Sequence, residues 1–455
     1  MIRTLTVDQA RQSVLQRRLL DDAEAPEAAL QALREATGRD VHTATEGVAH
    51  ILADVRARGD EAVRFYSRAL DGAELGPLEV PQSALEAAYM RLDRALRAAL
   101  EASAERIYRF HERQAQAEAG WLVEEGDSRL GQLVRPLERV GIYAPGGQAL
   151  YPSSVLMAAV PAQVAGVREI IVISPPSRAR LSEEGEHEVA VADVVLAAAR
   201  IGGAHRVFQV GGAQGIAALA YGTETVPQVD KILGPGGLFT VLAMRQLFGV
   251  TGIAGLPGPT ETLLIADDSA NPALVAADLL AQAEHDVLAS ALLLTPSRAL
   301  AARVAAEVTE QLARLPRRAI IEGSLERGSA IVLTGSLDEA MALANEYAPE
   351  HLCLLTESPW ALLGQVQHAG GVFVGESACE ALGDYIVGPS HIMPTSRTAR
   401  FNSPVNVRDF QKIISVFGVG DATLHATGRD AIRIAEAEGL QGHAEAIRRR
   451  LDKKE

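Results

Sequence analysis

The spacing of apolar residues changes once along the chain, near Val140. Before that point apolar residues recur every three or four positions between Arg and Glu, as in SALEAAYMRLDRALRAALEASAERIYRF, and this period is typical of amphipathic helices. Two short strand-like segments, GWLVEEG and GQLVRPL, close this part of the chain. The pattern predicts a mostly helical N-terminal region, which we assign to residues 1–140.

Beyond Val140, continuous apolar runs alternate with segments of helical period. The runs REIIVI, TLLIAD, SALLLT, SAIVLT and HLCLLT have the character of parallel strands buried on both faces. Strands that alternate with helices of ten or more residues indicate βαβ units. We therefore predict an α/β fold with two Rossmann-like parallel-sheet domains. The first domain is residues 260–404, which residues 1–140 complete, and the second is residues 141–259.

Residues 405–455 are predicted to form a separate C-terminal tail. The tail contains the strand-like FQKIISV and the polar helical segment RDAIRIAEAEGLQGHAEAIRRRL. A segment of this length cannot bury a core of its own, so we expect it to pack on another body.

Composition narrows the class of protein. The chain has 455 residues, of which 48% are apolar and 22% charged, a balance typical of globular proteins. Its longest apolar stretches are too short and too interrupted to span a membrane, and its N-terminus lacks the apolar core of a signal peptide, so we expect a cytoplasmic protein. The net charge of −15 argues against a nucleic-acid partner, because such binding depends on neutralising phosphates. The two cysteines, Cys353 and Cys379, form neither a disulfide framework nor a CxxC metal site.

Several polar residues have spacings that suit metal binding or catalysis, and each also has a plain structural interpretation. Gln282 and His285 stand three positions apart on the helix predicted from NPALVAADLLAQAEHDVLAS, a spacing that suits metal ligands or an exposed polar stripe. Asp384 and His391 occupy a loop after the last predicted strand, and ligand sites of open α/β sheets lie beyond the carboxyl ends of strands. His443 stands in the tail helix, where a surface histidine is equally ordinary.

An acid and a base, Glu350 and His351, lie side by side in NEYAPEHL, directly after Pro349. Taken alone, the pair suits a solvated helix terminus, where the helix dipole favours a histidine. Glycine turns at GGAQG (211–215) and GPGG (234–237) each follow a predicted strand and open a predicted helix. Such turns could bring a backbone close to a phosphate or could simply be turns.

These motifs become specific when they are taken together and in order. GPTETLLIAD, QAEH, NEYAPEHL, GDY with a downstream histidine, and EGLQGH follow one another, and VGIYAPGG, VGGAQGIAALAYGTE and VDKILGPG precede them. From about residue 25 to 450 the chain strongly resembles the histidinol dehydrogenase family, zinc- and NAD-dependent enzymes that complete histidine biosynthesis. The resemblance implies a four-electron oxidation of L-histidinol to L-histidine through bound histidinaldehyde.

The resemblance also implies a metal site and an oligomer. In this chain the zinc ligands would be Gln282, His285, Asp384 and His443, a set without thiolates that suits Zn²⁺ or a similar ion. In the family the tail histidine comes from the partner subunit of an intertwined homodimer, which would explain a tail without its own core. Histidinol would complete the coordination sphere.

Roles for the remaining motif residues follow from the same resemblance. His351 would take the hydroxyl proton in both hydride transfers, and Glu350 would activate the water that attacks the aldehyde. The positions that match the family's further substrate contacts are Thr260, His391 and Glu438, and those that match its NAD contacts are Tyr143, Gln214 and Gly237.

The chain departs from the family pattern mainly on the cofactor side. Gly237 stands where the family usually has Asn, Met244 where Lys is usual, and Thr260 replaces the more usual Ser. A paralogue that oxidises another polar alcohol, such as a sulfonated propanediol, is therefore an alternative. A zinc hydrolase that uses Glu350 to activate water, without a dinucleotide, and a non-catalytic metal- or nucleotide-binding module are two further alternatives.

Overall fold

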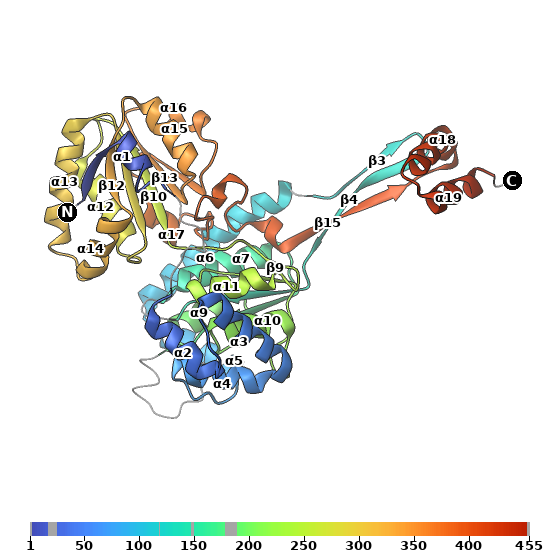
Figure 1. Ribbon diagram of the computed structural model, residues 1–455, viewed down its shortest axis with the longest axis horizontal. Helices are drawn as coiled ribbons and strands as arrows, with labels where there is room; N and C mark the ends of the chain where they lie inside the picture. The colour runs from blue at the N-terminus through green and yellow to red at the C-terminus, as the bar shows by residue number, and fades with distance from the viewer. Residues whose placement is uncertain (1, 17–24, 118, 147–149, 178–188, 453–455) are drawn as a thin grey trace. The chain divides into compact units, whose positions relative to one another are not determined.

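The computed structural model describes residues 2–16, 25–117, 119–146, 150–177 and 189–452 (Figure 1). The contacts divide the chain into two units. The larger, which we name the main unit, contains the chain up to Glu112 and Leu137–Phe410, and the smaller, the tail unit, contains Arg113–Pro136 and the chain from Gln411 onward. Gly147, the last residue of the motif VGIYAPGG, lies outside the described residues.

The main unit contains two six-stranded sheets, which confirm the predicted α/β class with parallel-sheet domains. Sheet 1 is parallel throughout. In spatial order its strands are β1 (Arg3–Thr6), β12 (Ala330–Leu333), β11 (Ser290–Thr295), β10 (Glu261–Ala266), β13 (His351–Leu355) and β14 (Gly371–Val374). Sheet 2 is parallel except for its first pair. Its strands are β2 (Glu79–Val80), β7 (Arg206–Phe208), β6 (Glu169–Ile173), β5 (Arg139–Tyr143), β8 (Lys231–Leu233) and β9 (Gly252–Ile253).

Helices cover both faces of sheet 1 (Figure 1). Successive strand residues point to opposite faces, so that Leu264 packs in one core cluster and its neighbour Leu263 in the other. The helices on the Leu264 side are α12 (Pro272–Ala283), α13 (Arg298–Leu312) and α14 (Arg318–Arg327). Those on the Leu263 side are α1 (Val7–Arg11), α15 (Leu337–Tyr347) and α16 (Pro359–Leu362), the last followed by η2 (Leu363–Gln365).

Sheet 2 carries the largest core cluster on one face. Phe208 and Ile232 of the sheet are buried there against α2 (Glu27–Thr37), α3 (Ala44–Arg58), α4 (Asp60–Asp71), α10 (Gly212–Tyr221) and α11 (Leu238–Leu247). A second group of helices forms successive layers on the sheet. Helix α7 (Pro152–Val164) packs on β5 and β6, α9 (Asp193–Ile201) packs on α7, and α5 (Gln82–Arg91) packs on α9.

The N-terminal region is divided between the two sheets. β1 pairs with β12 in sheet 1, whereas β2 pairs with β7 and helices α2, α3 and α4 bury their apolar faces against sheet 2. We had expected all of residues 1–140 to complete the domain of residues 260–404. Helical periodicity identifies an apolar face but not the sheet that covers it, which is why the sequence did not separate these segments.

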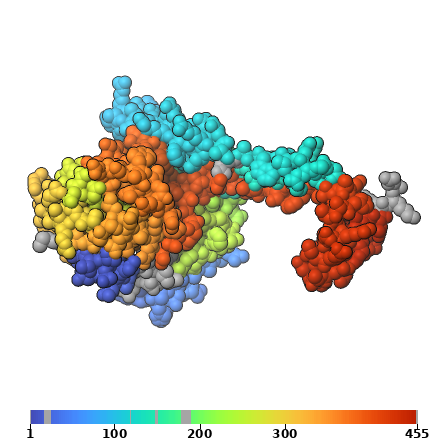
Figure 2. Space-filling view, turned by 90° about the horizontal axis from the view of Figure 1, so that it is seen from above, coloured from blue at the N-terminus to red at the C-terminus, as the bar shows by residue number. Residues whose placement is uncertain are grey.

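The tail unit is an antiparallel sheet followed by two helices. Its strands are β15 (Gln411–Gly418), β4 (Ser128–Pro136) and β3 (Trp121–Glu125), and its helices are α18 (Asp421–Ala437) and α19 (Gln441–Leu451). The predicted segments GWLVEEG and GQLVRPL are therefore strands, and GQLVRPL pairs with FQKIISV. In Figure 2 this pairing is visible as a cyan band, from β3 and β4, bordering the orange-red of β15.

Three short helices and one long helix complete the architecture. They are α6 (Arg94–Ala117), α17 (Glu380–Tyr385), η3 (Thr398–Arg400) and η4 (Val407–Phe410). Among the helices of the described ranges, none combines the length and the apolar character that a membrane crossing requires.

Candidate functional site

Both sheets reverse their strand order once, and ligand sites of open α/β sheets form at such a reversal. In sheet 2 the chain runs outward through β5, β6 and β7 and returns to β8 on the other side of β5. The carboxyl ends of β5 and β8 carry Tyr143 and the turn Gly234–Gly237. Gly234 has φ +122°, and an added Cβ would lie 2.2 Å from the carbonyl oxygen of Tyr143. Only glycine allows β5 and this turn to approach so closely.

Sheet 1 places the acid–base motif at the opposite end of its strands. Its order reverses between β10 and β13. Thr260 directly precedes β10, Glu350 precedes β13, and His351 is the first residue of β13. The candidate chemistry of sheet 1 therefore lies at the amino ends of its strands.

A tight turn brings Glu350 into the interior. Helix α15 ends at Tyr347, and Ala348 caps it in the left-handed conformation with φ +54° before Pro349. Glu350 is buried, and its Oε2 accepts hydrogen bonds from Thr260 Oγ1 at 2.7 Å and from the backbone N–H of Glu261 at 3.0 Å. Burial raises the pKa of Glu350 to about 7, although the nearby His351 and the hydrogen bonds oppose the shift.

The geometry of His351 leaves one ring nitrogen available as a base. Nδ1 lies 3.1 Å from the carbonyl oxygen of Glu261, and a carbonyl only accepts, so the proton of the neutral ring sits on Nδ1. Nε2 is buried and has no hydrogen-bond partner among the residues that the structure describes. Burial lowers the pKa of His351, but the carboxylates of Glu380 and Glu350 outweigh it and raise the pKa to about 9.

A hydrogen-bonded chain connects Gln282 to the acid–base pair. Gln282 is fully buried in the last turn of α12, and its Nε2 donates to Thr260 Oγ1 at 2.7 Å. That hydroxyl in turn donates to Glu350. The amide oxygen Oε1 of Gln282 is buried without a partner in the described part of the chain. A free amide oxygen in this position suits a cation or a ligand donor.

The structure corrects two of the expected placements. His285 does not lie on the same helix as Gln282, because α12 ends at Ala283 and His285 lies in the following turn, where its N–H donates to the Gln282 carbonyl at 3.3 Å. Asp384 lies in α17 and not in an open loop. It also does not lie beyond the carboxyl ends of sheet 1, because the segment after β14 returns α17 toward His351 at the amino ends. Periodicity does not reveal such a return.

His285 and Asp384 interact electrostatically, which supports the prediction that the two side chains belong to one site. Burial lowers the pKa of His285, and the charge of Asp384 opposes that shift. Together with the amide oxygen of Gln282 they offer three donors of the kinds that Zn²⁺ accepts. In the described ranges, no cluster of three or more His, Cys, Asp and Glu side chains is arranged to hold a metal, and the predicted set contributes only two such side chains from the main unit.

His391 connects the two sheets of the main unit. Its Nδ1 lies 2.6 Å from the carbonyl oxygen of Asp384, and its Nε2 lies 3.0 Å from Ser154 Oγ at the start of α7. Helix α7 follows β5 of sheet 2, so this bridge ties the segment that carries Asp384 and His391 to the carboxyl end of β5.

The expected cofactor residues share the carboxyl-end edge of sheet 2. The Tyr143 side chain is hydrogen-bonded to the side chain of Thr240 in α11 and to the backbone of Gly212. Burial raises the pKa of Tyr143. Gln214 is buried, and its Nε2 donates to Asp71 Oδ2 at 2.9 Å. Gly237 is the N-cap of α11, with open space where a side chain would project.

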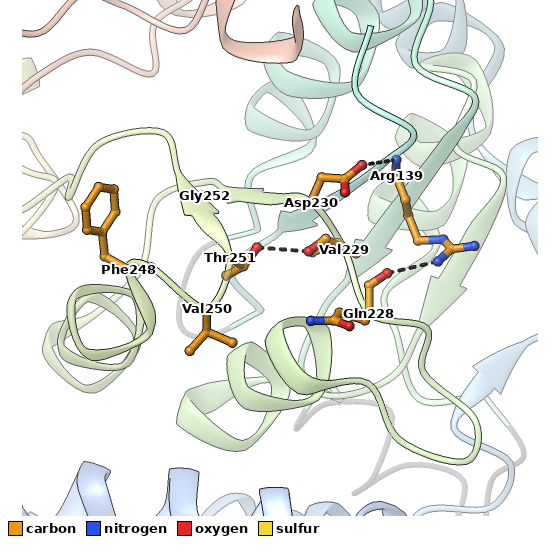
Figure 3. Close-up of a pocket in the computed structure, with 9 residues that line it drawn as sticks. Arg139, Gln228, Val229, Asp230, Phe248, Val250, Thr251 and Gly252 are labelled. Carbon is orange, nitrogen blue, oxygen red and sulfur yellow. Dashed lines mark hydrogen bonds between the residues drawn. The ribbon is translucent and has the colours of Figure 1, made fainter. Parts of the chain in front are cut away.

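A shallow recess on sheet 2 is separate from this edge (Figure 3). It lies at the amino end of β5, where Arg139 is the first residue and Tyr143 the last. Its polar groups are already paired: the Arg139 guanidinium donates to the Gln228 carbonyl, and Thr251 Oγ1 donates to the Val229 carbonyl. The recess therefore offers little to a ligand.

The tail unit carries the two remaining predicted residues. Glu438 is the C-cap of α18 and His443 lies in α19, and both are exposed. Their proximity to the other site residues stays a prediction.

Sequence reasoning missed Glu380, although its position four residues before Asp384, on one face of α17, was a usable signal.

Comparisons with known proteins agree along nearly the whole chain. The sequence model of the family described as histidinol dehydrogenase matches residues 34–451. A histidinol dehydrogenase of Deinococcus radiodurans is 54% identical over 428 residues, covering 94% of this chain and 95% of that protein. One of Thermus thermophilus is 53% identical over 405 residues, covering 89% and 94%. The crystal structure of histidinol dehydrogenase from Elizabethkingia anophelis is 31% identical with a TM-score of 0.87, covering 99% of this chain and 98% of that one.

The two parallel sheets, the buried acid–base pair and these matches define an α/β oxidoreductase. The glycine turns and the Glu–His motif occur within the matched range. The chain belongs to the histidinol dehydrogenase family, as its sequence motifs predicted.

The Thr260 hydroxyl is expected to stabilise the site measurably. Thr260→Val removes the hydroxyl between Gln282 and Glu350, leaving buried polar groups unpaired, at an expected cost of about 1–3 kcal/mol in the free energy of unfolding. Thr260→Ser keeps the hydroxyl and should cost under about 1 kcal/mol. Urea unfolding of the three proteins measures the difference, and equal stability of the Val and Ser variants would contradict the hydrogen-bonded chain.

Proposed function

We propose that this protein oxidises L-histidinol to L-histidine, the final step of histidine biosynthesis, with NAD as the hydride acceptor and zinc as the bound metal. The observation that carries the proposal is the buried Glu350–His351 pair, in which Nδ1 of His351 is held by the Glu261 carbonyl and Nε2 has no partner in the described chain. Membership of the family supplies the substrate. A cytoplasmic location stays a prediction.

The reaction requires two hydride transfers with one hydration between them. In the first, the alcohol gives a hydride to NAD and its hydroxyl proton to Nε2 of His351, leaving histidinaldehyde. Glu350 then accepts a proton from the water that attacks the aldehyde, while the His351 imidazolium returns its proton to the aldehyde oxygen, giving a gem-diol and a neutral His351. A second NAD takes hydride from the gem-diol while His351 accepts one hydroxyl proton, and the carboxylic acid that forms loses its remaining proton to solvent and becomes the carboxylate.

The buried environment suits Glu350 to its step near neutral pH, and it makes His351 a strong base that is fully available only above its pKa of about 9. Burial brings the pKa of Glu350 to about 7, which places it in the range where a general base is effective near neutral pH. The Glu350 carboxylate, whose Oε2 lies 3.7 Å from His351 Nδ1, favours the imidazolium that each proton transfer produces. Keeping the aldehyde bound between the two oxidations would protect this reactive intermediate.

Gln282 Oε1, His285 and Asp384 would hold the zinc, with His443 of the partner subunit as the fourth ligand. The fit rests on the unpaired, buried amide oxygen of Gln282 and on the electrostatic interaction of His285 with Asp384. When bound, the ion orients the substrate and adds positive charge that favours loss of its hydroxyl proton. Thr260, His391 and Glu438 would contact the substrate.

The NAD would lie along the carboxyl-end edge of sheet 2, where Tyr143, Gln214 and Gly237 meet the amino ends of α10 and α11. Backbone N–H groups at helix amino ends attract phosphates. The hydrolase and the non-catalytic module each leave one feature unexplained. A hydrolase does not require a dinucleotide-binding edge, and a non-catalytic module does not require an acid and a base side by side.

The tail unit supports a homodimer with shared sites. All of β3 is exposed, including Trp121. Ile413 and Phe417 of β15 are exposed as well, with 82% of the Phe417 surface accessible. Few apolar residues of this unit are buried, so it lacks a core of its own. We propose that a second copy of the chain covers these apolar residues and receives Glu438 and His443 into its site.

The stoichiometry of NADH tests the proposed function. Zinc-loaded protein should form two NADH for each L-histidinol consumed, and a chelator should abolish the reaction until zinc is restored. Absorbance at the NADH band measures both. A protein inert with histidinol but active with a sulfonated propanediol would identify the paralogue, and hydrolytic turnover without NAD would favour the hydrolase.

The two half-reactions separate the roles of Glu350 and His351. His351→Ala should slow the oxidations of both histidinol and histidinaldehyde by at least about a hundredfold, because each needs the same base. Glu350→Gln should slow aldehyde oxidation far more than alcohol oxidation, because only the aldehyde requires hydration. Single-turnover measurements with each substrate give the ratio, and equal losses in the glutamate variant would contradict this division.

Mixed dimers test the shared site. Chains with His351→Ala and chains with His443→Ala should each be inactive, while their co-expressed mixture should recover about a quarter of wild-type activity, because only one site of each heterodimer is complete. If every site uses a single chain, the mixture stays inactive. Mass spectrometry of the purified sample confirms that heterodimers have formed.

A further inference from the structure

The steps proposed above leave one buried carboxylate beside His351 without a role. Glu380 opens α17 and is 4% exposed. Its Oε1 lies 3.8 Å from Nδ1 of His351, and its Oε2 has no hydrogen-bond partner among the described residues. A buried carboxylate with an unpaired oxygen costs free energy that a neighbouring cation or proton must offset.

The two carboxylates beside His351 are held in different ways. Glu350 accepts hydrogen bonds from two neutral donors, Thr260 Oγ1 and the Glu261 N–H. Glu380 has the Thr262 hydroxyl and the edge of the His351 ring as its partners. Phe373 of β14 covers another side of the imidazole, with ring centroids 5.7 Å apart. Both carboxylates lie at a similar distance from His351, but Glu380 has fewer hydrogen-bond donors, so it depends more on His351 for charge compensation than Glu350 does.

We propose that Glu380 is a positioning residue for His351, a proposal that rests on the function proposed above. Its carboxylate holds the Nδ1 edge of the ring and stabilises the imidazolium that forms when Nε2 takes the substrate proton. In that step the alcohol O–H bond breaks toward Nε2, hydride leaves the carbon for NAD, and the C=O bond forms. Glu380 touches no reacting atom and acts through His351 alone.

Several other charged and titratable groups also face this imidazole. They are Glu350 from the turn before β13, Asp384 from α17 and His285 from the segment after α12. His391, from the segment after α17, also interacts electrostatically with His351, and the carbonyl of Glu261 in β10 lies against Nδ1. Burial lowers the pKa of His351, and among the charges that raise it Glu380 contributes more than Glu350 or Asp384. Removing the Glu380 charge should therefore have the largest effect.

The test compares zinc-loaded wild-type protein with Glu380→Gln, which keeps the size of the side chain and removes its charge. The rate falls on the acid side where His351 is protonated, so a less basic ring moves this limb of the kcat profile to lower pH. We expect a displacement of about one pH unit and a plateau kcat about tenfold lower in both half-reactions. The KM for histidinol should stay within about twofold, because Glu380 does not contact substrate.

Two further variants keep the inference falsifiable. Glu357→Gln removes an exposed carboxylate of the same charge and should leave the profile unchanged. Glu380→Asp retains a charge at a greater distance and should return the acid limb part of the way toward wild type, which a purely structural loss would not do. A wild-type profile in Glu380→Gln, or a loss confined to KM, overturns the inference.

A readout without turnover separates this inference from the proposed function. The protein labelled with ¹³C at histidine Cε1 reports ring titration by NMR, and His351→Ala identifies the resonance of His351. If wild type fails to oxidise histidinol, the proposed function fails, yet the His351 resonance of Glu380→Gln should still titrate at lower pH. An unchanged titration would overturn the role of Glu380 whatever the substrate is.

Discussion

The organisation of the site depends on the hydrogen bonds made by one buried carboxylate. Glu350 accepts from Thr260 and from the backbone of Glu261, and Thr260 also accepts from Gln282. A buried carboxylate is costly unless it is hydrogen-bonded, so these bonds hold the turn after α15, the start of β10 and the end of α12 together. Segments separated by up to ninety positions thereby meet at one edge of sheet 1.

Much of the fold could be predicted from the sequence because its strands are continuous apolar runs. TLLIAD, SALLLT and HLCLLT correspond to β10, β11 and β13, and their alternation with helices fixed the parallel class. The destination of α2, α3 and α4 could not be predicted in this way. An amphipathic helix shows which face it buries, whereas its partner is decided by long-range packing that no local pattern records.

The candidate site was predictable in its residues but not in its geometry. The spacing of Gln282 and His285 indicated a shared helical face, yet α12 ends between them. Asp384 follows a strand in sequence, yet α17 returns it to the opposite end of the sheet, near His351. Glu380 was missed because its spacing of four residues from Asp384 indicates a shared helical face but does not show that the carboxylate is buried beside an imidazole.

The bridge made by His391 has a consequence for ligand entry. Both ring nitrogens are already engaged, one by the Asp384 carbonyl and the other by the Ser154 hydroxyl. An incoming molecule that hydrogen-bonds to this imidazole must compete with Ser154 for the same nitrogen. A ligand bound at His391 Nε2 and the Ser154 hydroxyl therefore exclude each other, and the free energy of ligand binding is reduced by the free energy of the hydrogen bond that is lost.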